Sequence, residues 1–178
     1  MVFVVTACAA TAESTADKPA ELTFLHLNDT YRVGAVEDGK RGGFGRVVTL
    51  IRELQAQGRE VHITHGGDFL YPSLESQLWD GLQIVEAMNY VDALAPMYVT
   101  LGNHEFDGRT PEALINAVNA STFDWVSDNV VFRTGDAAAD AALRGAFTFE
   151  AAGRTIGVFS VTLHANDGGN DRAYVPTE

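Results

Sequence analysis

The chain has 178 residues, of which 46% are apolar and 20% charged, a balance that suits one globular domain and excludes disordered and fibrous proteins. The formal net charge of -12 argues against a nucleic acid polymer as partner, because binding to phosphate backbones needs clustered Lys and Arg. The single cysteine, Cys8, excludes an internal disulfide framework. An anionic substrate would have to be held by something other than basic side chains, and bound metal ions are the usual alternative.

The first 20 residues are similar to an export signal followed by a tether. Residues 1–8 are short and apolar, and the Val-Thr-Ala-Cys sequence ending at Cys8 resembles the lipobox of bacterial lipoproteins, in which the cysteine is lipidated. No positive charge precedes the apolar run, so an ordinary frayed N-terminus is the alternative. We expect residues 1–20 to be a truncated lipoprotein-type signal and flexible tether, with export to the periplasm or outer surface and a lipid anchor on Cys8.

From Leu22 onward the hydrophobic periodicity alternates between strand and helix. In chain order it predicts a strand at 22–27, a helix opened by the Gly-Gly-Phe-Gly sequence at 42–45 and stopped by Gly58, a strand at 61–64, a helix through 78–88, a strand at 97–101, a helix whose first turn contains Pro111, and a hairpin of 145–150 with 155–162. This order is typical of an α/β fold with a largely parallel central sheet. Right-handed crossovers place the carboxyl ends of the strands at one edge, where ligands of such folds gather.

Polar side chains follow each of the three predicted parallel strands. Asp29 follows the first strand, Asp68 the second, and Asn103 with His104 the third. Each alone has a structural explanation, since Asp and Asn are common in turns. Turn statistics do not readily explain three such residues at successive strand ends on one sheet edge. The spacing therefore predicts that these side chains converge and bind a cation.

Three short blocks carry a resemblance to a known family. Residues 28–29 (Asn-Asp), residues 66–73 (beginning Gly-Gly-Asp) and residues 102–107 (Gly-Asn-His-Glu-Phe-Asp) resemble the first three signature blocks of the calcineurin-like metallophosphoesterases. The third block is typical of the branch that contains periplasmic 5'-nucleotidases and nucleotide-sugar hydrolases. The resemblance covers the chain from Leu22 to its end. It implies a layered metallophosphoesterase-like sheet with flanking helices, incomplete at residue 178.

The resemblance also implies a role for five residues. Asp29 would bind the first of two divalent metal ions, Asp68 would bridge both, and Asn103 would bind the second through its amide oxygen. His104 would stabilise the transition state or protonate the leaving oxygen, with Asp107 orienting its imidazole. A carboxylate that bridges two cations about 3.5–4 Å apart suits hydrolysis of a phosphoester.

The sequence departs from the family pattern in two ways. The first block normally carries a histidine ligand two residues after the aspartate, whereas this chain has Tyr31. The family's remaining ligands, histidines from two later blocks, would follow the strand ending near Thr162, and residue 178 precedes both blocks. We therefore expect residues 21–178 to be the N-terminal portion of a metallophosphoesterase catalytic domain. The isolated 178-residue chain is expected to hydrolyse little or nothing.

Other polar residues have simpler explanations. His164 is a minor candidate for a ligand, and Glu105 is expected to face neighbouring backbone. We expect ordinary hydrogen-bonded histidines at His26, His62 and His65. A solvated basic surface, with an anion site as the alternative, is predicted for Lys40, Arg41 and Arg46.

The sequence thus predicts a metal-dependent phosphoesterase that hydrolyses phosphate monoesters, with nucleotides as the expected substrates, at a two-metal site. Carboxylate, amide and imidazole donors accommodate Mn, Zn, Fe or Co, so the metal is left open. The alternative is a noncatalytic metal- or nucleotide-binding lipoprotein domain, which Tyr31 and the missing later blocks would explain.

Overall fold

The computed structural model describes residues 21–108, 110–163 and 174–176. The lipobox-like segment with Cys8 and the loop with His164 lie outside these residues. The elements in chain order are β1 (Leu22–Leu27), α1 (Phe44–Ala56), β2 (Glu60–His65), α2 (Leu74–Trp79), α3 (Leu82–Asp92), β3 (Met97–Val99), the 3-10 turn η1 (His104–Phe106), α4 (Glu112–Ala120), β4 (Asp124–Val126), β5 (Val130–Phe132), α5 (Ala137–Ala142), β6 (Leu143–Arg144), β7 (Phe147–Ala151), β8 (Arg154–Val158) and β9 (Tyr174–Pro176). No helix in the described ranges is long and apolar enough to cross a membrane.

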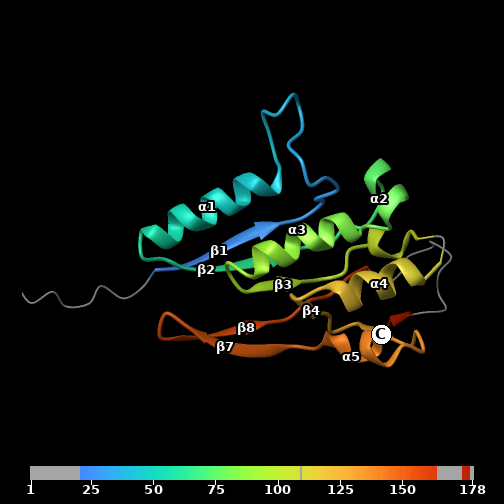
Figure 1. Ribbon diagram of the computed structural model, residues 1–178. Coiled ribbons are helices and arrows are strands. Elements are labelled where there is room, and N and C mark those ends of the chain that lie inside the picture. Colours follow the sequence, from blue (N-terminus) through green and yellow to red (C-terminus); the bar gives the residue numbers. More distant parts are fainter. Residues whose placement is uncertain (1–20, 109, 164–173, 177–178) are drawn as a thin grey trace, which may run out of the picture.

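A five-stranded parallel sheet forms the centre of the fold, in the order β1-β2-β3-β4-β6. Helices α1, α3 and α4 cover one face, and the antiparallel hairpin β7–β8 lies against the other (Figure 1). The first three strands end level with one another, because Leu27 pairs with His65 and His65 pairs with Val99. The predicted α/β class and parallel sheet are confirmed, and the three strand ends lie side by side.

The two faces of β2 show how the layers pack. Val61 and Ile63 are buried on the helix side, where apolar contact with α1 and α3 supplies the core. His62 points the other way, stacks on Tyr98 with ring centroids 6.1 Å apart, and lies 4.7 Å from the ring of Phe149 in the hairpin. Both faces of this central strand are therefore covered, as a parallel sheet requires.

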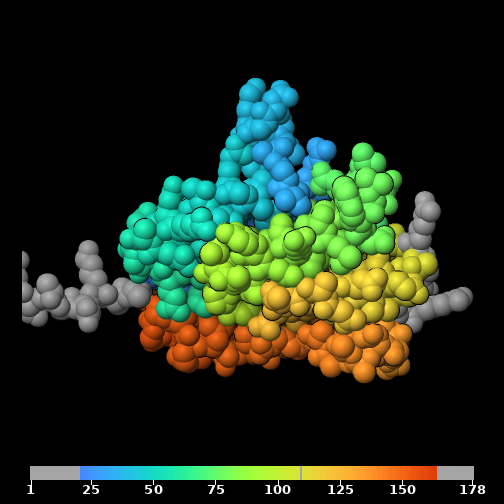
Figure 2. All heavy atoms as spheres, viewed as in Figure 1, coloured from blue at the N-terminus to red at the C-terminus, as the bar shows by residue number. Residues whose placement is uncertain are grey.

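The loop between β1 and α1, residues 28–43, projects from the body of the molecule (Figure 2). Its base is joined to α2 by an ion pair between Arg32 and Glu75, 3.8 Å apart. At its far end Val36 and Arg41 form an isolated antiparallel bridge. The loop and α2 thus stand at the edge of the sheet where β1 and β2 end.

Several predicted boundaries are wrong. The helix expected through 78–88 is two helices, because Asp80 and Gly81 adopt left-handed φ values of 52° and 80° between α2 and α3. A Cβ on Gly81 would lie 2.5 Å from Leu70 Cδ2, so this glycine lets the chain pass close to the core. The last strand of the hairpin ends at Val158, short of the predicted residue 162. The short elements β4, β5 and α5 were not predicted.

Candidate active site

The loops that follow β1, β2 and β3 carry the predicted site residues and contact one another. The backbone N–H of Asp29 donates to the carbonyl oxygen of Gly67 at 3.1 Å. The backbone N–H of His104 donates to Oδ1 of Asp68 at 2.7 Å, and Asn103 directly precedes His104. The structure therefore brings Asp29, Asp68 and Asn103 to the same sheet edge.

Asp29 and Asp68 both adopt an uncommon backbone conformation. Asp29 and Asp68 have positive φ values of 54° and 61°, a left-handed conformation that costs energy for residues other than glycine. Gly67 also has a positive φ of 86°, and a Cβ there would lie only 2.0 Å from the backbone nitrogen of Gly102. The loops after β2 and β3 are therefore in backbone contact directly beneath the carboxylate of Asp68.

Glu105 joins these two loops from inside the molecule. Its side chain is 1% exposed and accepts four backbone N–H groups. Oε1 accepts from Phe69 at 2.8 Å and Leu70 at 3.3 Å, while Oε2 accepts from Asp68 at 2.8 Å and Gly102 at 2.6 Å. Burial raises the pKa of Glu105, and the four N–H groups oppose that rise. The expectation that Glu105 faces neighbouring backbone is confirmed.

His104, the first residue of η1, pairs with Asp107, the residue that follows η1. Nδ1 of His104 lies 2.5 Å from Oδ2 of Asp107. This hydrogen bond raises the pKa of His104, against a smaller lowering by burial, and the charges of Asp107, Asp68 and Glu105 add to the rise. The imidazole is therefore favoured in its protonated form, with Nε2 as the ring nitrogen that does not bond Asp107.

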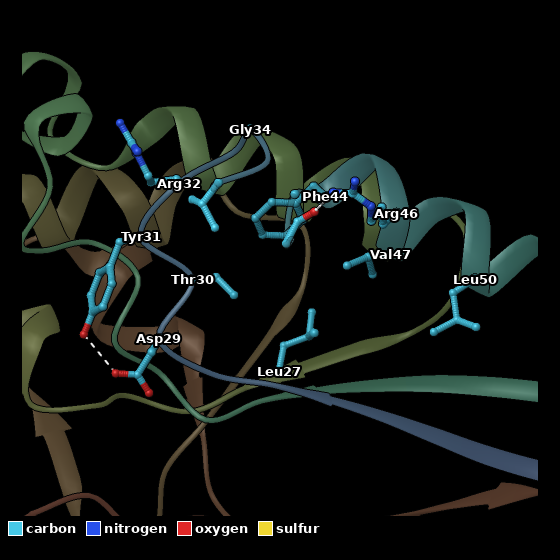
Figure 3. Close-up of a pocket in the computed structure, with 13 residues that line it drawn as sticks. Leu27, Asp29, Thr30, Tyr31, Arg32, Gly34, Phe44, Arg46, Val47 and Leu50 are labelled. Atoms are coloured by element: carbon cyan, nitrogen blue, oxygen red, sulfur yellow. Dashed lines mark hydrogen bonds between the residues drawn. The ribbon is translucent and has the colours of Figure 1, made fainter. Parts of the chain in front are cut away.

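Tyr31 occupies the position where the resemblance implies histidine. Its hydroxyl donates to Oδ1 of Asp29 at 3.0 Å, and Figure 3 shows the two groups turned toward each other. Its ring lies edge-on to that of His104, with centroids 6.1 Å apart. Burial is the main cause of a raised pKa of Tyr31, and the bond to Asp29 and the charges of Asp68 and Glu105 raise it further. Tyr31 is thus a neutral donor to Asp29.

A cavity of about 500 Å³ lies between the 28–43 loop and α1. Leu27, Val47 and Leu50 give it an apolar wall, while Asp29 and Tyr31 stand at one end with their polar groups directed away from Leu50 (Figure 3). The loop that covers it is held by Arg46, which is exposed and donates to the carbonyl oxygens of residues 42 and 39. The cavity therefore adjoins the site, with Asp29 and Tyr31 in its lining.

The site is rich in negative charge. In the described ranges no Lys or Arg forms an ion pair with Asp29 or Asp68. The same ranges contain no group of three His, Cys, Asp or Glu side chains placed to hold a metal ion. The donor set here is two carboxylates and the amide of Asn103, and such oxygen donors suit a hard or borderline cation. These residues fit part of a cation site by chemistry and by charge.

The three described histidines of the strands are hydrogen-bonded, as expected. His26 pairs with Thr64 at 2.9 Å, and His62 pairs with Glu60 at 3.2 Å. His65 is the one of the three that reaches the site loops: Nε2 lies 2.7 Å from Oγ1 of Thr30, and the N–H of Gly67 donates to Nδ1 at 3.1 Å. The sequence contains no signal for this pairing, because it depends on the register between β1 and β2.

Stability should depend on the protonation of His65. Burial lowers the pKa of His65 from 6.5 to about 4. Between these values the unfolded chain binds a proton that the folded chain excludes, so stability is lost as the pH falls. We expect this group to contribute about 2 kcal/mol to the loss between pH 7 and pH 4.5. Urea unfolding at both pH values should show a smaller loss for His65→Asn, and an equal loss would contradict the prediction.

Comparison with known proteins places the chain in a family. The model of the calcineurin-like phosphoesterases matches residues 22–177. Snake venom 5'-nucleotidase from Crotalus adamanteus is 34% identical over 123 residues, which are 62% of this chain and 20% of that protein. The 5'-nucleotidase of Vibrio vulnificus is 35% identical over 128 residues, 67% of this chain and 22% of that protein. The chain thus spans about a fifth of the length of these curated relatives.

Solved structures agree on the fold. The 5'-nucleotidase precursor of Thermus thermophilus superposes with a TM-score of 0.74 at 22% identity, covering 88% of this chain and 32% of that one. NAD nucleotidase from Haemophilus influenzae gives a TM-score of 0.71 at 23% identity, covering 87% of this chain and 29% of that one. The match over residues 22–177, together with this shared fold, shows that the chain belongs to the calcineurin-like phosphoesterase family.

Proposed function

We propose that the protein hydrolyses phosphate monoesters, and nucleotides in particular, at a site that holds two divalent metal ions. The observation that carries this proposal is that the polar loops after three strands lie together. The Asp68 carboxylate accepts from the backbone N–H of His104, and the side chain of His104 is hydrogen-bonded to Asp107. The 5'-nucleotidases among its relatives support a nucleotide substrate.

Asp29, Asp68 and Asn103 would hold the metal ions, with ligands from outside the described residues completing the set. When bound, divalent cations neutralise the phosphoryl oxygens and lower the pKa of water. The charge of Asp29 and Asp68 supports this role, since two carboxylates without a Lys or Arg ion-pair partner among the described residues favour a bound cation. Tyr31 would orient Asp29 through its hydroxyl.

His104 would act on the phosphoester itself. Its hydrogen bond to Asp107 fixes the ring and raises the pKa of His104, which favours the form that carries a proton on Nε2. That proton can bond a phosphoryl oxygen as negative charge develops, or pass to the leaving oxygen. Asp107 accepts from Nδ1 throughout and needs no proton of its own.

Two substitutions test the proposal in the protein encoded by the whole gene. Asp68→Asn keeps an acceptor for the His104 N–H but removes a charge, and His104→Gln removes the acid. Each should lower phosphate release from a nucleoside monophosphate with Mn²⁺ by at least about 100-fold. Asp38→Asn is the matched control, because Asp38 is exposed and also has a positive φ of 56°. Full activity in Asp68→Asn and His104→Gln would reject the assignment.

The noncatalytic alternative predicts a different metal content. A competent site should take up two Mn²⁺ per chain in a calorimetric titration, and Asp68→Asn should reduce that number. Uptake of one ion or none, together with no phosphate release from any nucleoside monophosphate, would favour a metal- or nucleotide-binding domain without activity.

Export with a lipid on Cys8 belongs to the same proposal and rests on the lipobox-like sequence. Cells that express the protein should incorporate a labelled fatty acid into it, and Cys8→Ser should abolish the label. A labelled Cys8→Ser variant would exclude this cysteine as the anchor.

A further inference from the structure

His65 is the last residue of β2 and is 2% exposed. Its Nδ1 must be an acceptor, because its partner is the backbone N–H of Gly67 at 3.1 Å. A neutral imidazole carries its one proton on the other nitrogen, so Nε2 donates to Oγ1 of Thr30 at 2.7 Å. The geometry thus assigns both the tautomer and the direction of both hydrogen bonds.

The two partners of His65 are the neighbours of the predicted ligands. Thr30 follows Asp29 directly, and Gly67 precedes Asp68 directly. A backbone bond from Asp29 N–H to the Gly67 carbonyl oxygen, 3.1 Å long, joins the same two loops. The imidazole and this backbone bond therefore form two links across one loop pair, and both aspartates lie within one residue of a link.

The imidazole of His65 is also held by packing against buried aromatic rings. Its ring lies edge-on to that of Phe69 with centroids 5.2 Å apart, and Phe69 packs on Trp125 at 5.6 Å. Phe69 and Trp125 are fully buried. A ring fixed in this way can impose a position on the loops that it bonds, because its own movement would disturb the core.

We propose that His65 is a positioning residue that holds the loop of Asp29 against the loop of Asp68 and thereby sets the affinity of the site for divalent metal. The effect on metal affinity rests on the proposed function, whereas the link between the two loops does not. Residues that hold metal ligands from the second layer typically change metal affinity by about 10–100-fold when replaced.

The test uses two variants of Thr30 and one of His65, the residues at the two ends of the hydrogen bond. Thr30→Val removes the hydroxyl at constant size, and Thr30→Ser restores it. His65→Asn keeps an acceptor near Nδ1 but cannot reach Thr30. The control is His62→Asn, which alters a buried histidine of the same strand on the opposite face.

Titration of the whole protein with Mn²⁺, followed by electron paramagnetic resonance, should show about 10-fold weaker binding for Thr30→Val and His65→Asn. Thr30→Ser and His62→Asn should bind as the parent does, and the double variant Thr30→Val/His65→Asn should be no weaker than either single one. Parent-like affinity in Thr30→Val, or additive losses in the double variant, would overturn the proposal.

Hydrogen exchange separates this result from failure of the proposed function. Without metal, peptides covering residues 27–31 and 65–70 should exchange about fivefold faster in Thr30→Val than in the parent or in Thr30→Ser. If the parent binds no Mn²⁺, the proposed function fails and exchange alone decides the link. Equal exchange in Thr30→Val and the parent would show that His65 does not hold the loops.

Discussion

Replacing Glu105 with glutamine is expected to lower the free energy of unfolding by about 2–4 kcal/mol, although the side chain keeps its size. Each carboxylate oxygen accepts two backbone N–H groups, so all four partners are donors. In either orientation the glutamine amide would direct its NH₂ group at two of these donors. A buried donor that loses its acceptor costs about 1–3 kcal/mol, and Glu105→Gln leaves two of them.

Urea unfolding measures this effect, with Glu86→Gln as the control. Glu86 lies exposed on α3, so the same chemical change there should shift stability by less than about 0.5 kcal/mol. Glu105→Asp should also lose stability, because the shorter side chain cannot reach both loops. Unfolding of Glu105→Gln at the same urea concentration as the parent would show that the four bonds contribute nothing measurable.

The parallel sheet and its polar edge could be predicted because their signals are local. Strand and helix periodicity extends over five or more residues in β1, β2 and α1, and Asp29 and Asp68 lie in the first three residues after a strand. The strands β4 and β5 have three residues each, too few to show alternation. Asp136 accepts from the N–H groups of Ala138 and Ala139 and so caps α5, a signal that the sequence contained.

The remaining differences come from contacts between distant segments. Leu78 and Leu82 fit one helical face, yet the chain breaks between them where Gly81 passes Leu70. The partners of Glu105 and His65 depend on which strands are neighbours and on their register. Sequence patterns could therefore predict which residues stand at the site edge, but not which buried side chains hold them there.

Replacing Gly102 with alanine is expected to cause a large loss of activity and of metal binding. A Cβ on Gly102 would lie 2.2 Å from Oδ1 and 2.7 Å from Cγ of Asp68, distances that no real Cβ tolerates. The methyl group must displace the carboxylate, which would lose its bond from the His104 N–H. We expect phosphate release by the whole protein to fall at least about 100-fold and Mn²⁺ binding to weaken about 10-fold or more.

Gly45→Ala is the control for this substitution, since a Cβ at Gly45 in the first turn of α1 meets nothing within 4 Å. There alanine should raise stability by about 0.5–1 kcal/mol and leave phosphate release unchanged. Thermal unfolding and Mn²⁺ titration of both variants distinguish a local effect on Asp68 from a general loss of structure. If Gly102→Ala binds Mn²⁺ as tightly as the parent, Asp68 does not contact the metal from its present position. Because the loops after β2 and β3 touch through backbone atoms, only a residue without a side chain can stand at Gly102 while Asp68 bonds the N–H of His104.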